Sequence, residues 1–399
     1  MFSLYKEINM KPLSIYIHIP FCVRKCSYCD FVSVAKPDSY KERYIDALIT
    51  EIRSSADLAA SHSLSTIYIG GGTPSLLGED LLERLLAAVS ENYNTDSIEE
   101  YTFECNPESI TPQKLELLKR YGVNRLSIGL QSTDREELLL LRRSHDYDAF
   151  LSAYALARKH GFENISVDLM FAVPGQSMDT LQRSLESITA LGPEHISCYS
   201  LIVEENTLMN RWVSEGKIEL PEDDEYVDMY RFLTGFLEQR GYRQYEISNF
   251  CREGFESVHN KAYWLRNNYL GLGVAAHSMI DNRRFANIDS VDDYMEKISE
   301  MESPVNLDSL ETLSHSDVIN EMIFLGLRMN KGIALSDIRS ELMQLGRCSD
   351  SSCPLVRDFD KKTAKLEKDG LVQVSSGSLA LTQKGRELSN SVFAELMVD

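Results

Sequence analysis

The chain has 399 residues, with 41 basic and 61 acidic side chains, so its formal net charge at pH 7 is −20. This acidic balance disfavours nucleic-acid binding and adsorption to anionic lipid, because both need basic surface. The length allows a large domain and a small one, and a hydrophobic fraction of 43% is enough for their cores.

The first residues lack the long apolar stretch of a secretory signal, and no apolar run reaches the length of a membrane span. The eight cysteines do not resemble a disulfide framework. Cys348 and Cys353 flank a polar loop and are interpreted as incidental thiols, with pairing or metal binding as the alternative. These features predict a cytoplasmic protein without a transmembrane segment and leave peripheral membrane contact open.

Short apolar runs alternate with longer helical patterns from residue 14 to about residue 241. Such runs, often β-branched, are typical of parallel strands that are covered on both faces. Six βα units in succession predict an α/β fold, and because eight units cannot be counted, a partial parallel barrel fits better than a full one. The expected strands are 14–20, 66–72, 100–106, 125–131, 164–171 and 195–202.

Three cysteines, Cys22, Cys26 and Cys29, follow the first expected strand. Three thiolates on one short loop suit zinc or an iron–sulfur cluster. A zinc site usually has a second Cys-x2-Cys pair, and none follows here. Four-iron clusters usually take four thiolates, so three would leave one iron open to another ligand. The alternative is three unrelated buried thiols, which the close spacing disfavours.

Polar or small residues recur at the ends of the later strands. Residues 70–73 end the second strand with Gly-Gly-Gly-Thr, Glu104 and Gln131 end the third and fourth strands, and Asp168 lies in the fifth. In parallel α/β folds, ligands gather at these carboxyl ends because the loops converge there. Each residue alone would be read as a solvated loop residue, but their recurrence predicts a ligand pocket.

The repeat loosens after about residue 203, and a glycine-rich run at 270–278 is expected to pack close to the barrel or a ligand. Residues 1–13 are expected to form a short lead, 14–300 the barrel domain and its extension, and 301–316 a linker. Helical patterns and two short strand-like runs predict a winged-helix-like α+β domain over 317–399. Its acidic balance favours a packing or partner role over DNA binding.

The Cys-x3-Cys-x2-Cys spacing, with Tyr28 before the last cysteine, is similar to the signature of radical S-adenosylmethionine (SAM) enzymes. Residues 15–22 resemble one branch of that family, the oxygen-independent coproporphyrinogen III oxidases and the related HemW-type haem chaperones. The resemblance implies a six-unit partial barrel and a [4Fe-4S] cluster on Cys22, Cys26 and Cys29. It further implies that SAM binds to the fourth iron.

The resemblance also implies which residues bind SAM. The loop of Gly71, Gly72 and Thr73 matches the segment that holds the methionine part. Arg143 matches an arginine near the carboxylate, with its neighbour Arg142 as the alternative. The full set implied for SAM is Tyr16, Tyr28, Gly71, Gly72, Thr73, Glu104, Gln131, Arg143 and Asp168.

Two features separate the branches. The decarboxylating oxidases have a fourth cysteine in the motif and a long amino-terminal extension, whereas Asp30 and Phe31 follow Cys29 here and the expected lead is short. The string from His259 to Trp264 matches the His-Asn-x-x-Tyr-Trp string of the haem chaperones. It implies haem contacts by His259, Asn260, Tyr263 and Trp264, with a structural histidine as the alternative reading.

We therefore expect a haem chaperone that binds haem as cargo, hands it to acceptor haemoproteins, and also binds a [4Fe-4S] cluster and SAM. Oxidative decarboxylation of coproporphyrinogen is the alternative, and no residue is assigned a catalytic role. A structural zinc-binding module is a third possibility, which metal analysis would separate from an iron protein. The family resemblance also implies an electron donor, either a reductase or a protein of the flavodoxin or ferredoxin type.

Overall fold

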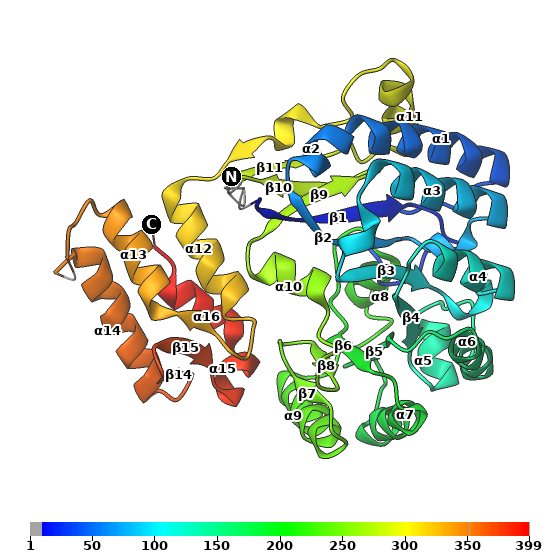
Figure 1. Cartoon of the computed structure of the whole chain (residues 1–399). Helices are drawn as coiled ribbons and strands as arrows, with labels where there is room; N and C mark the ends of the chain where they lie inside the picture. Colours follow the sequence, from blue (N-terminus) through cyan, green and yellow to red (C-terminus); the bar gives the residue numbers. More distant parts are fainter. Residues whose placement is uncertain (1–9, 351, 399) are drawn as a thin grey trace, which may run out of the picture.

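The computed structural model describes residues 10–350 and 352–398, so most of the expected lead at 1–13 lies outside the described residues. Its main feature is a sheet of twelve strands in the order β12-β11-β10-β9-β1-β2-β3-β4-β5-β6-β8-β7 (Figure 1). The central six strands are β1 (Pro12–Ile19), β2 (Ser63–Gly71), β3 (Glu100–Cys105), β4 (Arg125–Gln131), β5 (Ile165–Phe171) and β6 (His195–Ser200).

These six strands all pair in parallel with their sequence neighbours. Apolar β-branched side chains such as Ile15, Ile17 and Ile19 are fully buried between the sheet and its helices, which explains the runs in the sequence. The register brings Ile19 opposite Gly71, so the loops after β1 and β2 start side by side. The α/β fold with a partial six-unit parallel barrel is confirmed.

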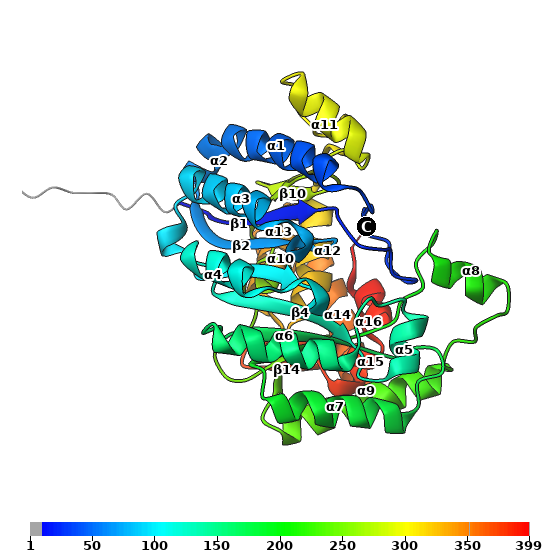
Figure 2. The ribbon, with the colours of Figure 1, turned by 90° about the vertical axis from the view of Figure 1, so that its right-hand side faces the viewer.

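Helices cover the outer face of these strands, and Figure 2 shows α1, α3, α4, α6 and α7 lying one after another along it. Helix α4 begins as its sequence predicts, because the Thr111 side chain accepts a hydrogen bond from the Lys114 backbone and Pro112 occupies the first turn. The covering helices are α1 (Asp38–Ser54), α2 (Ala56–Ala60), α3 (Glu79–Asn92), α4 (Pro112–Arg120), α5 (Arg135–Leu140), α6 (Tyr147–Lys159) and α7 (Met178–Leu191).

The sheet does not close, because further strands extend it at both ends. β9 (Asn268–Leu272) pairs in parallel with β1, and the glycine-rich run at 270–278 therefore includes a barrel-side strand. Next to it lie the antiparallel strands β10 (His277–Ile280), β11 (Arg283–Ala286) and β12 (Glu311–Thr312), and beyond β6 lie β8 (Asn249–Cys251) and β7 (Arg243–Gln244). The remaining helices of this part are α8 (Leu208–Ser214), α9 (Asp223–Gln239), α10 (Val258–Trp264) and α11 (Val291–Ser299).

A smaller carboxyl-terminal part has its own apolar core, which includes Ile319, Phe359 and Leu379. It lies beside α10 (Figure 1). It contains α12 (His315–Gly326), β13 (Ile333–Ala334), α13 (Leu335–Leu345), α14 (Pro354–Lys368), β14 (Val372–Ser375), β15 (Ser378–Leu381), α15 (Gln383–Glu387) and α16 (Ser389–Leu396). Within the expected linker at 301–316, β12 pairs with β11, and the domain boundaries stay a prediction. Among the described residues, no helix is long and apolar enough to cross a membrane.

Candidate functional site

A cavity of about 430 Å³ opens at the carboxyl ends of the central strands. Its walls come from the loops after β1, β2, β3 and β4, and from the inward side chains of β4, β5 and β6. Of the residues predicted for the cluster and SAM, those that line it are Cys22, Cys26, Cys29, Tyr28, Gly71, Gly72, Thr73, Glu104, Gln131, Arg143 and Asp168. The structure thus gathers residues that lie far apart in the sequence.

The cysteine loop is held in shape by backbone hydrogen bonds at its base. Val34 N–H donates to Pro20 O at 2.7 Å, and Cys22 N–H donates to Val34 O at 3.1 Å. The middle of the loop is fixed by the fully buried Ser27, whose hydroxyl donates to Leu140 O at 2.8 Å. These contacts hold the loop against the end of α5, with its three thiols along one side of the cavity.

The three thiols line the cavity without forming a site for a single metal ion. Among residues 10–350 and 352–398, no group of three or more His, Cys, Asp or Glu side chains could hold a single metal ion. In an iron–sulfur cluster each thiolate binds a different iron, so a wider spacing suits it. Burial raises the pKa of the Cys22 thiol and raises that of Cys29 to about 11, and binding to iron would favour the thiolate.

The glycines of the second loop let backbone approach backbone. A Cβ atom on Gly72 would lie 2.8 Å from Phe21 O, so only glycine fits beside the start of the cysteine loop. Gly71 has a φ of +111°, a conformation that L side chains rarely adopt. The Thr73 hydroxyl follows directly and lies 3.7 Å from Cys22 Sγ. The glycines therefore allow close contact between the two loops, and the predicted role of this loop in SAM binding stays a prediction.

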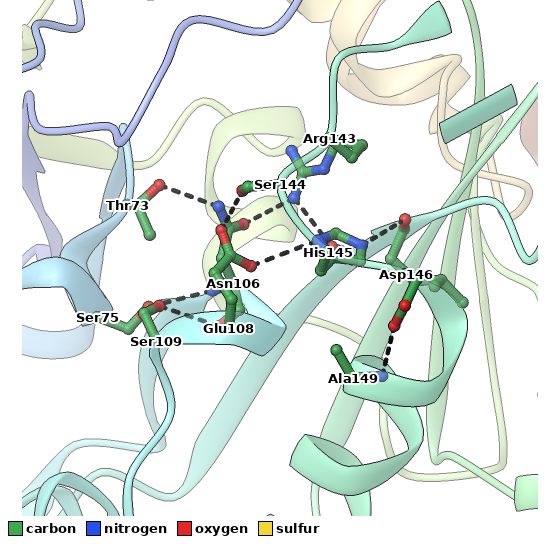
Figure 3. A network of polar contacts seen from close by, with 12 residues as sticks. Thr73, Ser75, Asn106, Glu108, Ser109, Arg143, Ser144, His145, Asp146 and Ala149 are labelled. Carbon is green, nitrogen blue, oxygen red and sulfur yellow. Dashed lines mark hydrogen bonds and ion pairs between the residues drawn. The ribbon is translucent and has the colours of Figure 1, made fainter. Parts of the chain in front are cut away.

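A chain of polar contacts runs from Cys22 to Cys26, and its central part is drawn in Figure 3. Asn106 Nδ2 donates to Thr73 Oγ1 at 3.2 Å, while Asn106 Oδ1 accepts from Arg143 Nη2 at 2.7 Å. Arg143 Nη1 in turn lies 3.4 Å from Cys26 Sγ. Asn106 was missed by the sequence analysis, although it lies two residues after Glu104 at the end of the same strand.

The same network settles which of the two neighbouring arginines points inward. Arg143 is 9% exposed, whereas Arg142 is exposed at the rim of the cavity and has a φ of 58°. His145 stabilises the turn that buries Arg143, because its Nδ1 lies 3.4 Å from Glu108 Oε2 (Figure 3). Ser144 donates a hydrogen bond to the same carboxylate.

Two partly buried carboxylates face the cavity. Burial raises the pKa of Glu104 to about 7, although Tyr68 Oη donates to Glu104 Oε1 at 2.6 Å. Burial also raises the pKa of Asp168 to about 6, and Ser127 Oγ donates to Asp168 Oδ1 at 3.1 Å. Both groups can change charge near neutral pH, and a cationic ligand would favour their ionised forms.

Gln131 and Tyr16 complete the predicted set. Gln131 is buried, has a φ of 74°, and accepts a hydrogen bond from Tyr199 Oη at 2.8 Å. Tyr16 is placed differently, because it is not among the described residues that line the cavity. Its hydroxyl lies 2.9 Å from His18 Nδ1, and its ring packs against Tyr68.

The residues predicted to contact haem lie on α10. His259 is 1% exposed, and both ring nitrogens are engaged: Nδ1 lies 2.8 Å from Thr66 Oγ1 and Nε2 lies 3.0 Å from Tyr263 Oη. Burial lowers the pKa of His259 to about 3. In this arrangement no ring nitrogen is free for iron, which matches the structural-histidine alternative. The predicted haem role stays a prediction.

The other residues of the string are divided between two environments. Asn260 lines the cavity, on the side away from the cysteine loop. The Trp264 ring lies under the Arg328 guanidinium at 4.4 Å, in the small apolar cluster that also includes Tyr245. Helix α10 therefore presents one amide to the cavity and uses its aromatic residues for packing.

The comparisons with known proteins agree with this geometry. The model of the radical SAM superfamily matches residues 16–188, and that of the HemN C-terminal domain matches residues 313–388. Heme chaperone HemW of Bacillus subtilis is 36% identical over 96% of this chain and 99% of its own length. The chain belongs to the HemW family of radical SAM proteins.

Other members and neighbours extend this result. Heme chaperone HemW of Lactococcus lactis is 35% identical over 98% of both chains. The solved structure of HemN, the coproporphyrinogen III oxidase of Escherichia coli and a radical SAM enzyme, superposes with a TM-score of 0.82. It shares 27% identity and covers 98% of this chain and 92% of its own. The HemW string from His259 to Trp264 lies outside both segments that the family models match.

Proposed function

We propose that this protein is a haem chaperone that carries a [4Fe-4S] cluster and SAM and passes haem to acceptor haemoproteins. The proposal rests on the observation that three thiols of one loop line the same cavity. The relatives that this chain matches over nearly their whole length are named heme chaperones. An electron donor of the flavodoxin, ferredoxin or reductase type belongs to the same proposal.

Cys22, Cys26 and Cys29 are the proposed cluster ligands. Three protein thiolates leave one iron of a four-iron cluster for SAM, and a cluster of this kind supplies single electrons. Arg143 stands next to Cys26 as a fixed positive charge, which suits the carboxylate of SAM. Changing the three cysteines to serine should abolish the iron–sulfur absorption of anaerobically reconstituted protein, whereas a full cluster in that variant would refute the assignment.

The proposed SAM contacts divide by charge. Glu104 and Asp168 supply negative charge for the ammonium and sulfonium groups, and their burial strengthens this attraction. The peptide groups of Gly71 and Gly72, together with Thr73, provide a close-fitting polar wall. Gln131, Tyr28 and Tyr16 complete the set, with Tyr16 acting from behind Tyr68.

For haem, contact by His259, Asn260, Tyr263 and Trp264 remains part of the proposal. Iron coordination by His259 requires α10 to move away from β2, because both ring nitrogens are engaged. Such a movement would also expose the Tyr263 and Trp264 rings, which could then pack on a porphyrin face.

The rim of the cavity supports a further haem contact that needs no movement. Val23, Phe31 and Ile202 line its mouth and are 57%, 59% and 65% exposed. Apolar side chains exposed together on a soluble surface commonly mark a binding site. A flat apolar haem face would cover them, with Arg24 and Arg142 nearby for the propionates.

One specific observation favours a second candidate, oxidative decarboxylation of coproporphyrinogen III. The HemN enzyme has the same fold over nearly the whole chain. The two functions separate in parallel assays on anaerobically reconstituted protein: haem binding with transfer to an apo-haemoprotein, and SAM-dependent coproporphyrinogen turnover. We expect haem transfer without decarboxylation, and robust formation of protoporphyrinogen would overturn the chaperone proposal.

A further inference from the structure

Arg125 places a positive charge deep in the barrel. It has no role in the proposed contacts to the cluster or to SAM. It is the first residue of β4, and the side chains of Arg125, Ser127 and Gln131 lie on the inward face of that strand and line the cavity. Arg125 is 2% exposed. Arginine is rarely buried to this degree unless a carboxylate accompanies it, because removing its charge from water is costly.

The guanidinium of Arg125 has few direct contacts with polar groups of the protein. Among residues 10–350 and 352–398, its guanidinium makes one hydrogen bond, a long contact of 3.5 Å from Nη1 to Thr102 Oγ1, and its buried Nε–H has no acceptor. Among the residues that the structure describes, Arg125 forms no ion pair within 4.0 Å. Its contact Thr102 donates onward to the buried carboxylate of Glu100 at 3.1 Å, and the charge of Arg125 counteracts the rise in the pKa of Glu104 and Asp168, so carboxylates lie near the guanidinium without contacting it. The hydrogen-bond donors of this buried guanidinium therefore lack a direct carboxylate acceptor.

The strand register places Arg125 below the level of the predicted SAM residues. Arg125 pairs with Thr102, and two residues further along the same pair of strands Ser127 is opposite Glu104. The cavity is also lined by Ser166, which is opposite Ser127 and His195 in the sheet, and by Asn249 and Asn260. We name Arg125, Ser166, His195, Asn249 and Asn260 the lower chamber.

The other walls of the lower chamber are neutral. His195 lies 2.8 Å from Ser166 Oγ and 3.0 Å from Tyr245 Oη, and burial lowers its pKa well below the usual range. Asn249 and Asn260 contribute amide groups. Glu104 and Asp168 border the chamber from above, and they oppose an anion there unless they are protonated or neutralised by a cationic ligand.

We propose that the lower chamber binds a carboxylate group, with Arg125 as its charged anchor. A guanidinium fork fits a carboxylate better than any other common ligand group, and in a buried site such a pair is strong. The chamber lies beyond the contacts assigned to the cluster and SAM, so this binding adds a third site to the cavity. The carboxylate belongs either to a free small acid or to the propionate arm of a tetrapyrrole.

The first arm of the test asks whether Arg125 binds a carboxylate at all. The melting temperature of the full chain is measured in sodium propionate and in sodium chloride at equal ionic strength and pH. We expect propionate to raise the wild-type value by about 2 °C relative to chloride. Arg125→Gln should remove this difference, while Arg120→Gln, which changes an exposed arginine on α4, should keep it.

The second arm identifies the source of the carboxylate by titrating haem and haem dimethyl ester, in which the propionates are blocked. If the chamber takes a tetrapyrrole propionate, wild type binds haem about tenfold more tightly than the ester, and Arg125→Gln removes that preference. If the chamber binds a free acid, Arg125→Gln removes the propionate effect on the melting temperature but does not change the relative affinities for haem and its ester. Should Arg125→Gln not fold, Arg125→Lys, which keeps the charge but loses the fork, is expected to halve both effects.

If Arg125→Gln changes neither the propionate effect on the melting temperature nor the preference for haem over its ester, the lower chamber is not a carboxylate site. Failure of the chaperone proposal gives a different result, because wild type then binds neither haem nor its ester. The melting temperatures in propionate and chloride then test the lower chamber alone. Circular dichroism of each variant confirms that the fold is retained.

Discussion

Asn106 joins two side chains that contact different cysteines of the proposed cluster site. Its amide group donates to Thr73, and its carbonyl group accepts from Arg143. A carboxamide can do both at once, whereas a carboxylate or an apolar side chain cannot. The position of Arg143 therefore depends on a neutral residue that the sequence motif does not mark.

Replacing Asn106 with alanine should loosen this link without removing a cluster ligand. Arg143 would keep its contact with Gly129 O, so we expect SAM affinity to fall about fivefold, corresponding to one lost hydrogen bond of about 1 kcal/mol. Equilibrium dialysis of labelled SAM with reconstituted protein measures this. Asn92→Ala, on the outer helix α3, is the matched control, and equal affinity of both variants would contradict the assigned role.

His259 provides a second prediction at this scale, through the pH dependence of stability. Its pKa is lowered to about 3 in the folded protein by burial and is about 6.5 when unfolded. The unfolded chain therefore binds the proton more readily, so the contribution to stability is complete above pH 6.5 and is lost as the pH falls towards 3. Between pH 7 and pH 5, wild type should lose about 2 kcal/mol relative to His259→Gln.

Urea unfolding of the two proteins at both pH values measures this difference. His315→Gln, which alters a partly exposed histidine on α12, should show a much smaller change. A histidine open to solvent or to haem iron would titrate near its usual pKa in the folded protein. A difference that does not vary with pH would therefore restore the reading of His259 as an accessible haem ligand.

Residues of the cluster motif could be predicted from sequence because their spacing is local. Asn106 and Arg125 could not, since their importance depends on which face of a strand points inward and on what lies opposite. The match from His259 to Trp264 shows the complementary problem. Its residue types suit haem, but the partner that occupies His259 Nδ1 is Thr66, which lies 193 residues earlier in the chain.

At the level of elements, the close contact between the first two barrel loops depends on Gly72. A Cβ atom there would meet Phe21 O at 2.8 Å and Ile19 O at 2.9 Å, and both are backbone atoms that cannot rotate away. We expect Gly72→Ala to cost about 1–3 kcal/mol of stability and to displace the start of the cysteine loop.

Iron and sulfide content after reconstitution, together with the melting temperature, measures the effect of Gly72→Ala. Gly235→Ala is the matched control, because Gly235 lies within α9 with open space around it and should gain up to about 1 kcal/mol. Full cluster content and unchanged stability in Gly72→Ala would show that the two loops are not tightly coupled.

The central strands were predictable because each is a short apolar run that pairs with its sequence neighbour. The outer strands β10, β11 and β12 were not, because they are at most four residues long and their sequences alternate weakly. Strand β9 was harder still. It pairs with β1, more than 250 residues earlier, as with Leu270 opposite Ile15, and local patterns carry no information about such a pairing.

At the scale of the whole molecule, Glu321 is one of several buried carboxylates that join the small domain to the large one, together with Glu387, which pairs with Arg231, and Glu246, which lies 3.7 Å from Arg328. Glu321 of α12 accepts hydrogen bonds from Arg266 at 2.7 Å and from Arg284, and its side chain is 7% exposed. Glu321→Gln leaves two arginines without their counter-charge, so we expect a loss of about 3 kcal/mol.

Limited proteolysis between residues 301 and 316, and unfolding monitored by two probes, would detect this weakened docking. Glu311→Gln is the control, since its contact with Arg284 is longer, at 3.8 Å, and more exposed. Identical cleavage rates in wild type and Glu321→Gln would show that other contacts between the domains, such as the pair of Arg231 with Glu387, and not this carboxylate, hold the domains together.

The outermost strands of the large sheet, β12 (Glu311–Thr312) and β7 (Arg243–Gln244), are each two residues long. A sheet edge recruits a strand from another protein only where it offers a row of unpaired peptide groups, and edges this short offer very few. At the edges of this sheet, the acceptor protein of the proposed function would therefore be recognised through side chains. The proposed hand-over by such a route would be reversible, because no shared sheet has to be broken before the partners separate.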